Sequence, residues 1–150
     1  MKKIILLSLI VLGFSTCRKG KVKSQAELDE KIITNYISDN NLNATATGSG
    51  LYYVVWTEGT GAQPNSNSNV TVNYKGSLKD GTVFDQSTSA GVTFNLNSVI
   101  KGWQEGIPLF KKGGRGVLLI PSALGYGSNA SGKIPANSVL IFDIDLINVQ

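Results

Sequence analysis

Hydrophobic residues recur at every third or fourth position over one stretch near the start of the chain. The stretch follows Ser24, and Glu27 stands three residues later, which is the spacing of a capping box at a helix N-terminus. The apolar stripe consists of Leu28, Ile32, Ile33, Tyr36 and Ile37. This period predicts one amphipathic helix over residues 25–39, and the polar, Gly-containing residues 40–50 end it.

Two roles compete for this helix. It could pack against the flank of its own domain, or it could form part of a dimer or client contact. We favour self-packing, because an amphipathic stripe usually faces a core.

From residue 51 onward, apolar and polar residues alternate in short runs that polar turns separate. The alternation is clearest at Val70, Val72 and Tyr74, and again at Val92, Phe94 and Leu96. Further strands are expected at residues 51–57, at a short run ending near Phe84, and at residues 117–120 and 139–149. Residues 99–109 are the only other helical candidate, kinked or ended by Pro108. This order predicts an α+β fold, a twisted antiparallel sheet wrapped on one short central helix, with an extra N-terminal helix.

The first residues have the pattern of an export signal. Two lysines follow Met1, and residues 4–14 form an apolar run of eleven residues, which is too short to span a bilayer as a helix. We therefore interpret residues 1–17 as a signal peptide, residues 18–23 as a tether, residues 24–49 as the helix and linker, and residues 50–150 as the domain.

Cys17 is the only cysteine of the chain and stands directly after this run. Its position resembles the lipobox of bacterial lipoproteins, in which the thiol is acylated and becomes the new N-terminus. The resemblance implies a lipid anchor on Cys17 and a location in the cell envelope, on the periplasmic face of the inner or outer membrane. The alternative is an ordinary secretory signal with an incidental cysteine.

The positive charge is concentrated in the same N-terminal segment. The chain carries 14 basic and 10 acidic residues, but six of the basic residues precede Ser24, which leaves eight basic against ten acidic residues in the rest. The part expected to fold is therefore slightly acidic. This distribution indicates no binding site for nucleic acid.

Missing residue types narrow the chemistry further. The sequence has no histidine, and its one cysteine lies in the leader, which excludes Ser-His-Asp and Cys-His hydrolysis and zinc sites with His or Cys ligands. The glycine-rich residues 113–116 lack the Lys-Ser/Thr ending of a phosphate loop and are expected to form a turn. Asp143 and Asp145 share a strand face without a third carboxylate, so we expect a solvent-facing rim and no metal site. No cofactor is expected.

Six aromatic residues and one acid stand out in the second half of the chain. The aromatic residues are Tyr74, Phe84, Phe94, Trp103, Tyr126 and Phe142, and Asp85 directly follows Phe84. All of them except Phe94 lie in five motifs, Val-Thr-Val-Asn-Tyr-Lys-Gly, Asp-Gly-Thr-Val-Phe-Asp, Val-Ile-Lys-Gly-Trp, Pro-Ser-Ala-Leu-Gly-Tyr-Gly and Ile-Pro-Ala-Asn-Ser-Val-Leu-Ile-Phe-Asp. In this order and spacing, residues 50–149 resemble the FKBP-type peptidyl-prolyl cis-trans isomerases.

The resemblance implies a role for each matching residue. Trp103 would form the floor under a substrate proline, and the walls would be Tyr74, Phe84, Val99, Ile100 and Phe142. The Ile100 N–H and the Tyr126 hydroxyl would hold substrate carbonyls, while Asp85 would lie at the rim, hydrogen-bonded to the Tyr74 hydroxyl. Ile134 would belong to a flap over the substrate, and Val92, which stands where many members have an aromatic residue, would also contact the substrate. The implied partners are proline-containing polypeptides, with macrolide inhibitors as a further possibility.

Prolyl isomerisation requires no nucleophile and no general base. Rotation about an amide loses resonance across a barrier of about 18–20 kcal/mol, and an apolar box favours the less polar twisted amide. Three hypotheses remain open: an exported, lipid-anchored isomerase, a proline-peptide-binding module or chaperone with little turnover, and a structural or glycan-contacting envelope lipoprotein. Without the motif order, Trp103 and Phe142 would be ordinary core residues, and Asp85 a turn cap.

Overall fold

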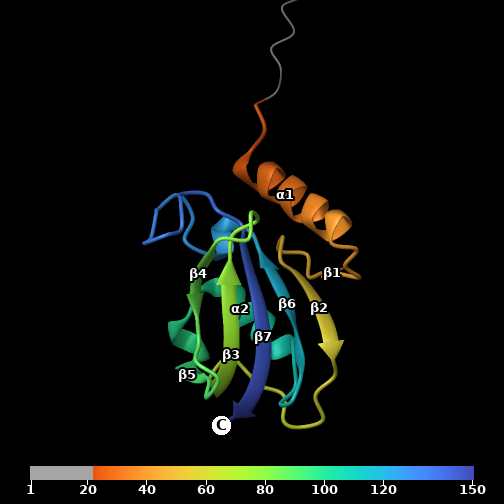
Figure 1. Cartoon of the computed structure of the whole chain (residues 1–150), viewed down its shortest axis with the longest axis vertical. Coiled ribbons are helices and arrows are strands. Elements are labelled where there is room, and N and C mark those ends of the chain that lie inside the picture. Colours follow the sequence, from red (N-terminus) through yellow and green to blue (C-terminus); the bar gives the residue numbers. More distant parts are fainter. Residues whose placement is uncertain (1–21) are drawn as a thin grey trace, which may run out of the picture.

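The computed structural model describes residues 22–150, and these residues form one antiparallel sheet with a helix on each of its faces (Figure 1). The expectations for residues 1–21, including the signal peptide and Cys17, lie outside the described residues. The helices are α1 (Gln25–Asp39) and α2 (Lys101–Gly106), and three short 3-10 segments are η1 (Leu96–Ser98), η2 (Ile107–Leu109) and η3 (Ser122–Leu124). The strands are β1 (Thr45–Ala46), β2 (Tyr52–Thr57), β3 (Asn69–Ser77), β4 (Val83–Gln86), β5 (Val92–Asn95), β6 (Arg115–Ile120) and β7 (Leu140–Val149).

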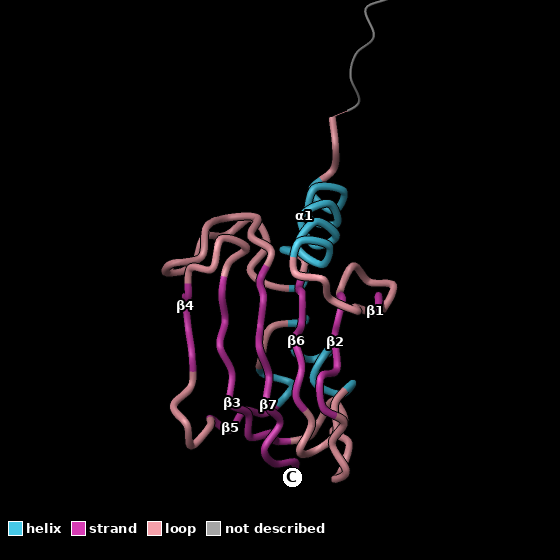
Figure 2. Tube along the Cα trace, turned by 45° about the vertical axis from the view of Figure 1, so that its right-hand side comes forward, coloured by secondary structure: helices cyan, strands magenta, loops and turns pink. Residues whose placement is uncertain are grey.

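Strand β7 lies in the middle of the sheet and pairs with both β6 and β3. The spatial order is β1-β2-β6-β7-β3-β4, which can be followed across Figure 2, and β5 also pairs with β3. The edge position beside β3 is therefore shared, with β4 opposite its last residues and β5 opposite its first. All of these pairs are antiparallel, which confirms the expected α+β fold.

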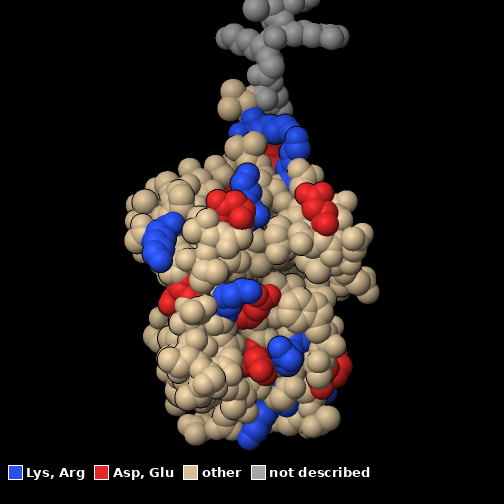
Figure 3. All heavy atoms as spheres, in the orientation of Figure 1, with Lys and Arg blue, Asp and Glu red and all other residues tan. Residues whose placement is uncertain are grey.

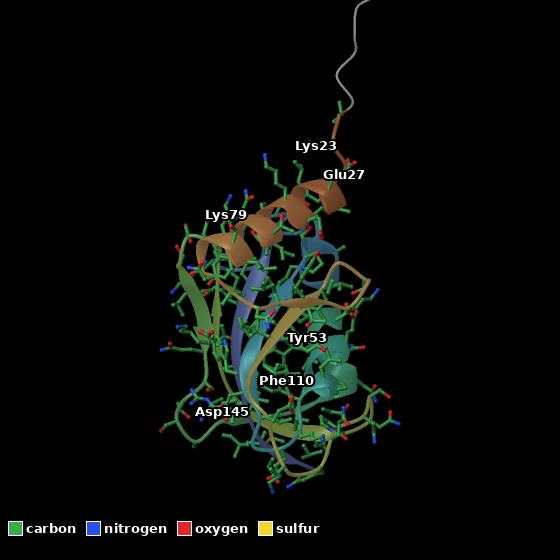
Figure 4. The ribbon with its side chains drawn as sticks, turned by 90° about the vertical axis from the view of Figure 1, so that its right-hand side faces the viewer. Lys23, Glu27, Tyr53, Lys79, Phe110 and Asp145 are labelled. Carbon is green, nitrogen blue, oxygen red and sulfur yellow. The ribbon has the colours of Figure 1, made fainter. Side chains whose placement is uncertain are left out.

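One face of the sheet carries the main core. Inward side chains of the central strands, among them Val72, Leu118 and Ile144, pack with Trp103 and Ile107 of the α2–η2 segment. Figure 4 shows this sheet edge-on, with Phe110 inside the layer between the sheet and α2 and Asp145 on the opposite side. The alternation of side chains along each strand thus separates an apolar face from a second, mixed face.

Helix α1 covers the upper part of the second face, so its self-packing is confirmed. Ile33 is fully buried against Val54, Val117, Leu119 and Ile141 from β2, β6 and β7. The expected capping box is present, with the Ser24 N–H donating to Glu27 Oε2 at 2.8 Å. Within residues 22–150, no helix combines the length and the apolar character needed to span a membrane.

The buried face of α1 differs from the expected stripe in one respect. Leu28 is 41% exposed, whereas its neighbour Asp29 is only 1% exposed. The other four residues of the stripe are buried in, or packed against, the apolar cluster under the helix, so the expected face meets the domain and Asp29 extends it. Asp29 faces inward because the N–H and the hydroxyl of Ser122, on the domain, donate hydrogen bonds to its carboxylate.

Two further segments can be compared with the sequence-based expectation. The helical candidate over residues 99–109 ends near Pro108, as expected, because α2 ends at Gly106 and Pro108 lies in the 3-10 segment η2. The expected linker before residue 51 contains the two-residue strand β1, which pairs with β2. Gly48 and Gly50 have positive φ angles of 99° and 94°, which lets the chain turn sharply between β1 and β2.

Below α1, the second face of the sheet is open to solvent and carries ion pairs. Lys75 Nζ lies 3.1 Å from Asp143 Oδ2, and Arg115 Nε lies 3.7 Å from Asp145 Oδ2. The two aspartates therefore face solvent, as the sequence predicted, but from the central strand β7 and not from a rim of the sheet. On the face shown in Figure 3, basic and acidic side chains are interspersed and do not gather into a basic stripe.

Candidate active site

A cleft with a volume of about 340 Å³ opens beside α2, among residues from four strands, η1, α2 and the loop that follows η3. Its lining residues are Tyr74, Asp85, Phe94, Ser98, Val99, Ile100, Trp103, Tyr126 and Phe142. Seven of these nine residues were expected from the sequence, namely all except Phe94 and Ser98. Hydrophobic walls with a few polar groups at the edge are typical of ligand sites.

Trp103 lies at the floor of this cleft with only 4% of its surface exposed. Three aromatic rings meet it edge to face, with centroid distances of 5.1 Å to Tyr74, 5.3 Å to Phe94 and 5.2 Å to Phe142. Such perpendicular contacts are the favourable geometry for aromatic pairs. They fix the indole ring from several sides, which makes the floor rigid.

Two glycines explain how α2 brings Trp103 to this position. A Cβ at Gly102 would lie 2.5 Å from Ile120 Cγ2, and a Cβ at Gly106 would lie 2.6 Å from Leu118 Cδ1. Both glycines face β6, because residues four apart share one side of a helix. The short helix can therefore lie directly on the sheet, with Trp103 held beside β3 and β7.

The Trp103 indole also carries an unusual polar atom. Its Nε1 is buried and has no hydrogen-bond partner among the described residues. A buried unsatisfied donor costs about 1–3 kcal/mol. Sites that tolerate such a cost are often functional, which agrees with the position of this ring at the floor of the cleft.

A polar pair lies at the rim. The Tyr74 hydroxyl donates a hydrogen bond to Asp85 Oδ2 at 2.8 Å, as the sequence led us to expect. Burial raises the pKa of Tyr74 to about 12, and the hydrogen bond to Asp85 adds to this shift. Tyr126, which is 40% exposed, is a further and smaller cause of the raised pKa of Tyr74.

Gly76 allows the wall beside Asp85 to form. It pairs with Asp85 across β3 and β4, and a Cβ here would lie 2.5 Å from Phe84 Cε2 and 2.8 Å from Phe142 Cε1. The absence of a side chain lets these two rings approach each other edge to face, at a centroid distance of 5.5 Å. Phe84 thereby supports Phe142 from behind.

Ile100 lies at the start of α2. Its carbonyl accepts hydrogen bonds from the Trp103 N–H at 2.9 Å and from the Gln104 N–H at 3.1 Å. The Gln104 side chain donates to the Val99 carbonyl at 2.8 Å, so the extended residues before α2 are held in place. These bonds fix the Ile100 backbone at the edge of the cleft.

Three residues expected at the site do not line the cleft. Phe84 lies behind Phe142, and Ile134 is 5% exposed and belongs to the main core. Val92 is 37% exposed and pairs with Val72 at the start of β5, so its assignment to the cleft is corrected. Phe94, two residues further along the same strand face, contacts Trp103 and Tyr74 instead.

The period-two alternation places Val92 and Phe94 on one strand face, so it marks Phe94 as a second candidate for the cleft. It does not decide between the two residues. No sequence signal marked Ser98, which lies in η1. No cluster of three or more His, Cys, Asp or Glu side chains suited to a metal ion occurs within residues 22–150.

Comparison with known proteins agrees with this fold. A family model described as FKBP-type peptidyl-prolyl cis-trans isomerase matches residues 60–147. The chain belongs to this family.

Individual relatives carry the same family name. The FKBP-type peptidyl-prolyl cis-trans isomerase FkpA of Buchnera aphidicola subsp. Schizaphis graminum is 50% identical over 107 residues, which cover 69% of this chain and 42% of that protein. The crystal structure of FkpA from Escherichia coli superimposes with a TM-score of 0.74 and 38% identity, over 84% of this chain and 61% of that one. A crystal structure of a peptidyl-prolyl cis-trans isomerase from Pseudomonas syringae pv. tomato superimposes with a TM-score of 0.72 and 32% identity, over 86% of this chain and 98% of that one. The chain spans about half the length of the curated relatives it matches.

Proposed function

We propose that this chain catalyses cis–trans isomerisation of X-Pro bonds in polypeptide clients. The observation that carries the proposal is the edge-to-face aromatic floor around Trp103, with the Tyr74–Asp85 pair at its rim. A flat apolar floor suits the proline ring, and the polar rim suits the amide that precedes it. The membership in the family supports this assignment.

The proposed mechanism uses the cleft as an apolar, partly dry surrounding for a twisting amide. A planar amide is more dipolar than a twisted one, so removal of water disfavours the ground state relative to the transition state. The Ile100 N–H and the Tyr126 hydroxyl would hold the carbonyls on either side of the bond, and the Asp85 carboxylate would face the carbonyl that turns. Uncatalysed X-Pro bonds relax in tens to hundreds of seconds, so turnover in about 10 ms requires roughly 4–5.5 kcal/mol of stabilisation.

An exchange experiment on a panel of X-Pro peptides tests the proposal. We expect faster cis–trans exchange in NMR spectra with catalytic amounts of protein, and a macrolide inhibitor of the family should compete if it enters the same cleft. A binding module would instead shift peptide resonances at stoichiometric concentration and leave the exchange rate unchanged, which would contradict the proposal. A peptide in which Ala replaces Pro is the matched control.

We further propose that the protein is an exported lipoprotein, anchored through Cys17, whose clients are polypeptides of the cell envelope. The support is the basic and apolar leader with one cysteine at its end. Fractionation of Cys17→Ser should move the protein from the membrane to the soluble fraction, whereas the neighbouring change Ser15→Ala should not. Equal membrane retention of Cys17→Ser and wild type would contradict the anchor.

A further inference from the structure

Asp29 is a buried acid in the second turn of α1, outside the cleft. Only 1% of its surface is exposed. Its Oδ2 accepts two hydrogen bonds from one residue of the domain, the Ser122 N–H at 2.8 Å and the Ser122 hydroxyl at 2.6 Å. Its Oδ1 accepts a third, from Gln25 Nε2 at 2.7 Å. Three donors offset the loss of water around the carboxylate.

Ser122 lies four residues before Tyr126, and its own carbonyl organises the loop between them. This carbonyl accepts hydrogen bonds from the Gly125 N–H at 3.0 Å and from the Gly127 N–H at 2.8 Å. The two donors flank Tyr126 in the sequence. Ser122 is therefore bound to α1 on its amino side and to both neighbours of Tyr126 on its carbonyl side.

We propose that Asp29 is a positioning residue for Tyr126, and that α1 thereby forms part of the active-site scaffold. This inference rests on the proposed isomerase function, in which the Tyr126 hydroxyl holds a substrate carbonyl. Tyr126 is 40% exposed and lies between two glycines, so the position of its hydroxyl depends on how firmly the backbone of this loop is held. The hydrogen bonds from Ser122 to Asp29 restrain the backbone of this loop, which its glycines would otherwise leave free to move.

Docking of the helix alone does not require a buried acid. The apolar contact of Ile33 with Val54, Val117 and Ile141 already joins α1 to the sheet. A hydrophobic residue of similar volume at position 29 would dock equally well, since buried charged groups are seldom better than apolar packing for stability. The carboxylate differs from such a residue because its hydrogen bonds are directional. They fix the position of one backbone N–H and one hydroxyl at the start of η3.

Paired variants in two backgrounds test this role. Asp29→Ala should lower kcat/KM about two- to tenfold in the wild-type background, the ratio expected when one neutral hydrogen bond is lost. In the Tyr126→Phe background the same change should have no further effect, because the hydroxyl that it positions is already absent. Equal losses in both backgrounds, or no loss in the wild type, would overturn the inference.

Two further variants separate positioning from helix docking. Asp29→Asn has the same shape, and its amide oxygen can still accept both hydrogen bonds from Ser122. Its amide nitrogen then faces Gln25, whose side-chain amide can turn to accept from it. This variant should therefore retain most of the activity. The control is Glu30→Ala, which removes the neighbouring hydrogen bond from the Tyr52 hydroxyl to Glu30 Oε1 at 2.5 Å and leaves Ser122 untouched. It should leave kcat/KM unchanged. A similar loss in Glu30→Ala would assign the effect to docking in general.

Hydrogen exchange gives a readout that needs no activity. In Asp29→Ala the Gly127 amide, which donates to the Ser122 carbonyl, should exchange faster, while amides of β6 and β7 keep their wild-type protection. Unchanged exchange at Gly127 in an active protein would overturn the positioning role. If the wild type shows no isomerase activity, the proposed function fails, and exchange at Gly127 still reports whether α1 holds this loop.

Discussion

The Tyr74 hydroxyl and Asp85 Oδ2 are 2.8 Å apart and join the wall of the cleft to its rim. Tyr74 also meets the Trp103 ring edge to face, so one side chain links the floor to the only carboxylate in the cleft lining. The bond holds Asp85 in one orientation, and it makes the Tyr74 phenol part of the fold. Both consequences can be measured.

The first prediction concerns stability in alkali. The pKa of Tyr74 is raised to about 12 in the folded protein, chiefly by burial, from about 10 in the unfolded chain. The protonated phenol therefore contributes stability that is fully present below about pH 10 and is lost as the pH rises toward 12. The free energy of unfolding, measured with urea, should fall over this range more steeply for the wild type than for Tyr74→Phe.

Two other tyrosines titrate in both proteins and so cancel in this comparison. Burial raises the pKa of Tyr36, and the hydrogen bond to Glu30 raises that of Tyr52. A constant difference between wild type and Tyr74→Phe from pH 9 to 12 would show that the Tyr74 hydroxyl contributes no such stability.

The second prediction ranks two polar groups of the cleft by their effect on turnover. Tyr126→Phe removes one neutral hydrogen bond and should cost roughly 0.5–1.5 kcal/mol in kcat/KM. Asp85→Ala should cost more, because its charge acts at an apolar edge where water screens it poorly. Asp80→Ala is the control, since Asp80 caps the exposed turn at Thr82. An Asp85→Ala protein as active as the Asp80→Ala protein would exclude the proposed role of the carboxylate.

The third prediction is a flat pH profile of kcat/KM from about pH 6 to 8. Histidine is the side chain whose ordinary pKa falls in this range, and the sequence has none. Tyr74, with its pKa near 12, remains protonated throughout. A bell-shaped profile centred in this window would require an acid and a base that the proposed mechanism does not contain.

The fourth prediction uses the two tryptophans as a matched pair. Trp103 is 4% exposed and holds three aromatic contacts, whereas Trp56 on β2 is 53% exposed. Trp103→Ala should lower the free energy of unfolding by about 3–5 kcal/mol and weaken peptide binding, because it opens the floor. Trp56→Ala should change stability by about 0.5 kcal/mol or less. Denaturation followed by circular dichroism measures both, and equal effects would contradict the assignment of the floor.

The fifth prediction compares two apolar residues of α1. Ile33 is fully buried under the helix, and Leu28 is 41% exposed. Ile33→Ala should cost about 2–5 kcal/mol of stability, while Leu28→Ala should cost about 0.5 kcal/mol or less. A loss from Leu28→Ala as large as that from Ile33→Ala would contradict the exposed position of Leu28 on the helix.

The α1 example shows which parts of the fold the sequence could predict. The capping box and the four-residue period are local signals, and they placed the helix at residues 25–39, as the structure does. The burial of Asp29 was not a local signal, because its partner Ser122 lies 93 residues further along the chain. The spacing of apolar residues along a helix cannot reveal such a partner.

The candidate site shows the same division. The aromatic motifs predicted one site that contains Tyr74, Asp85, Trp103, Tyr126 and Phe142, and these five residues line one cleft. The choice between Val92 and Phe94 depended on where β5 begins and on its pairing with β3, which period-two alternation does not determine. Similarly, Gly102 and Gly106 give no sign in the sequence that β6 lies against them.

The central position of β7 has a consequence for the order in which the molecule can form. Residues 140–149 complete the sheet between β3 and β6, supply inward side chains to the main core and place Ile141 under α1. A ribosome, which releases the N-terminal end first, therefore releases a chain with neither of its apolar layers closed. We expect the polypeptide to remain without stable tertiary structure until β7, its last strand, emerges, and then to fold in one late step.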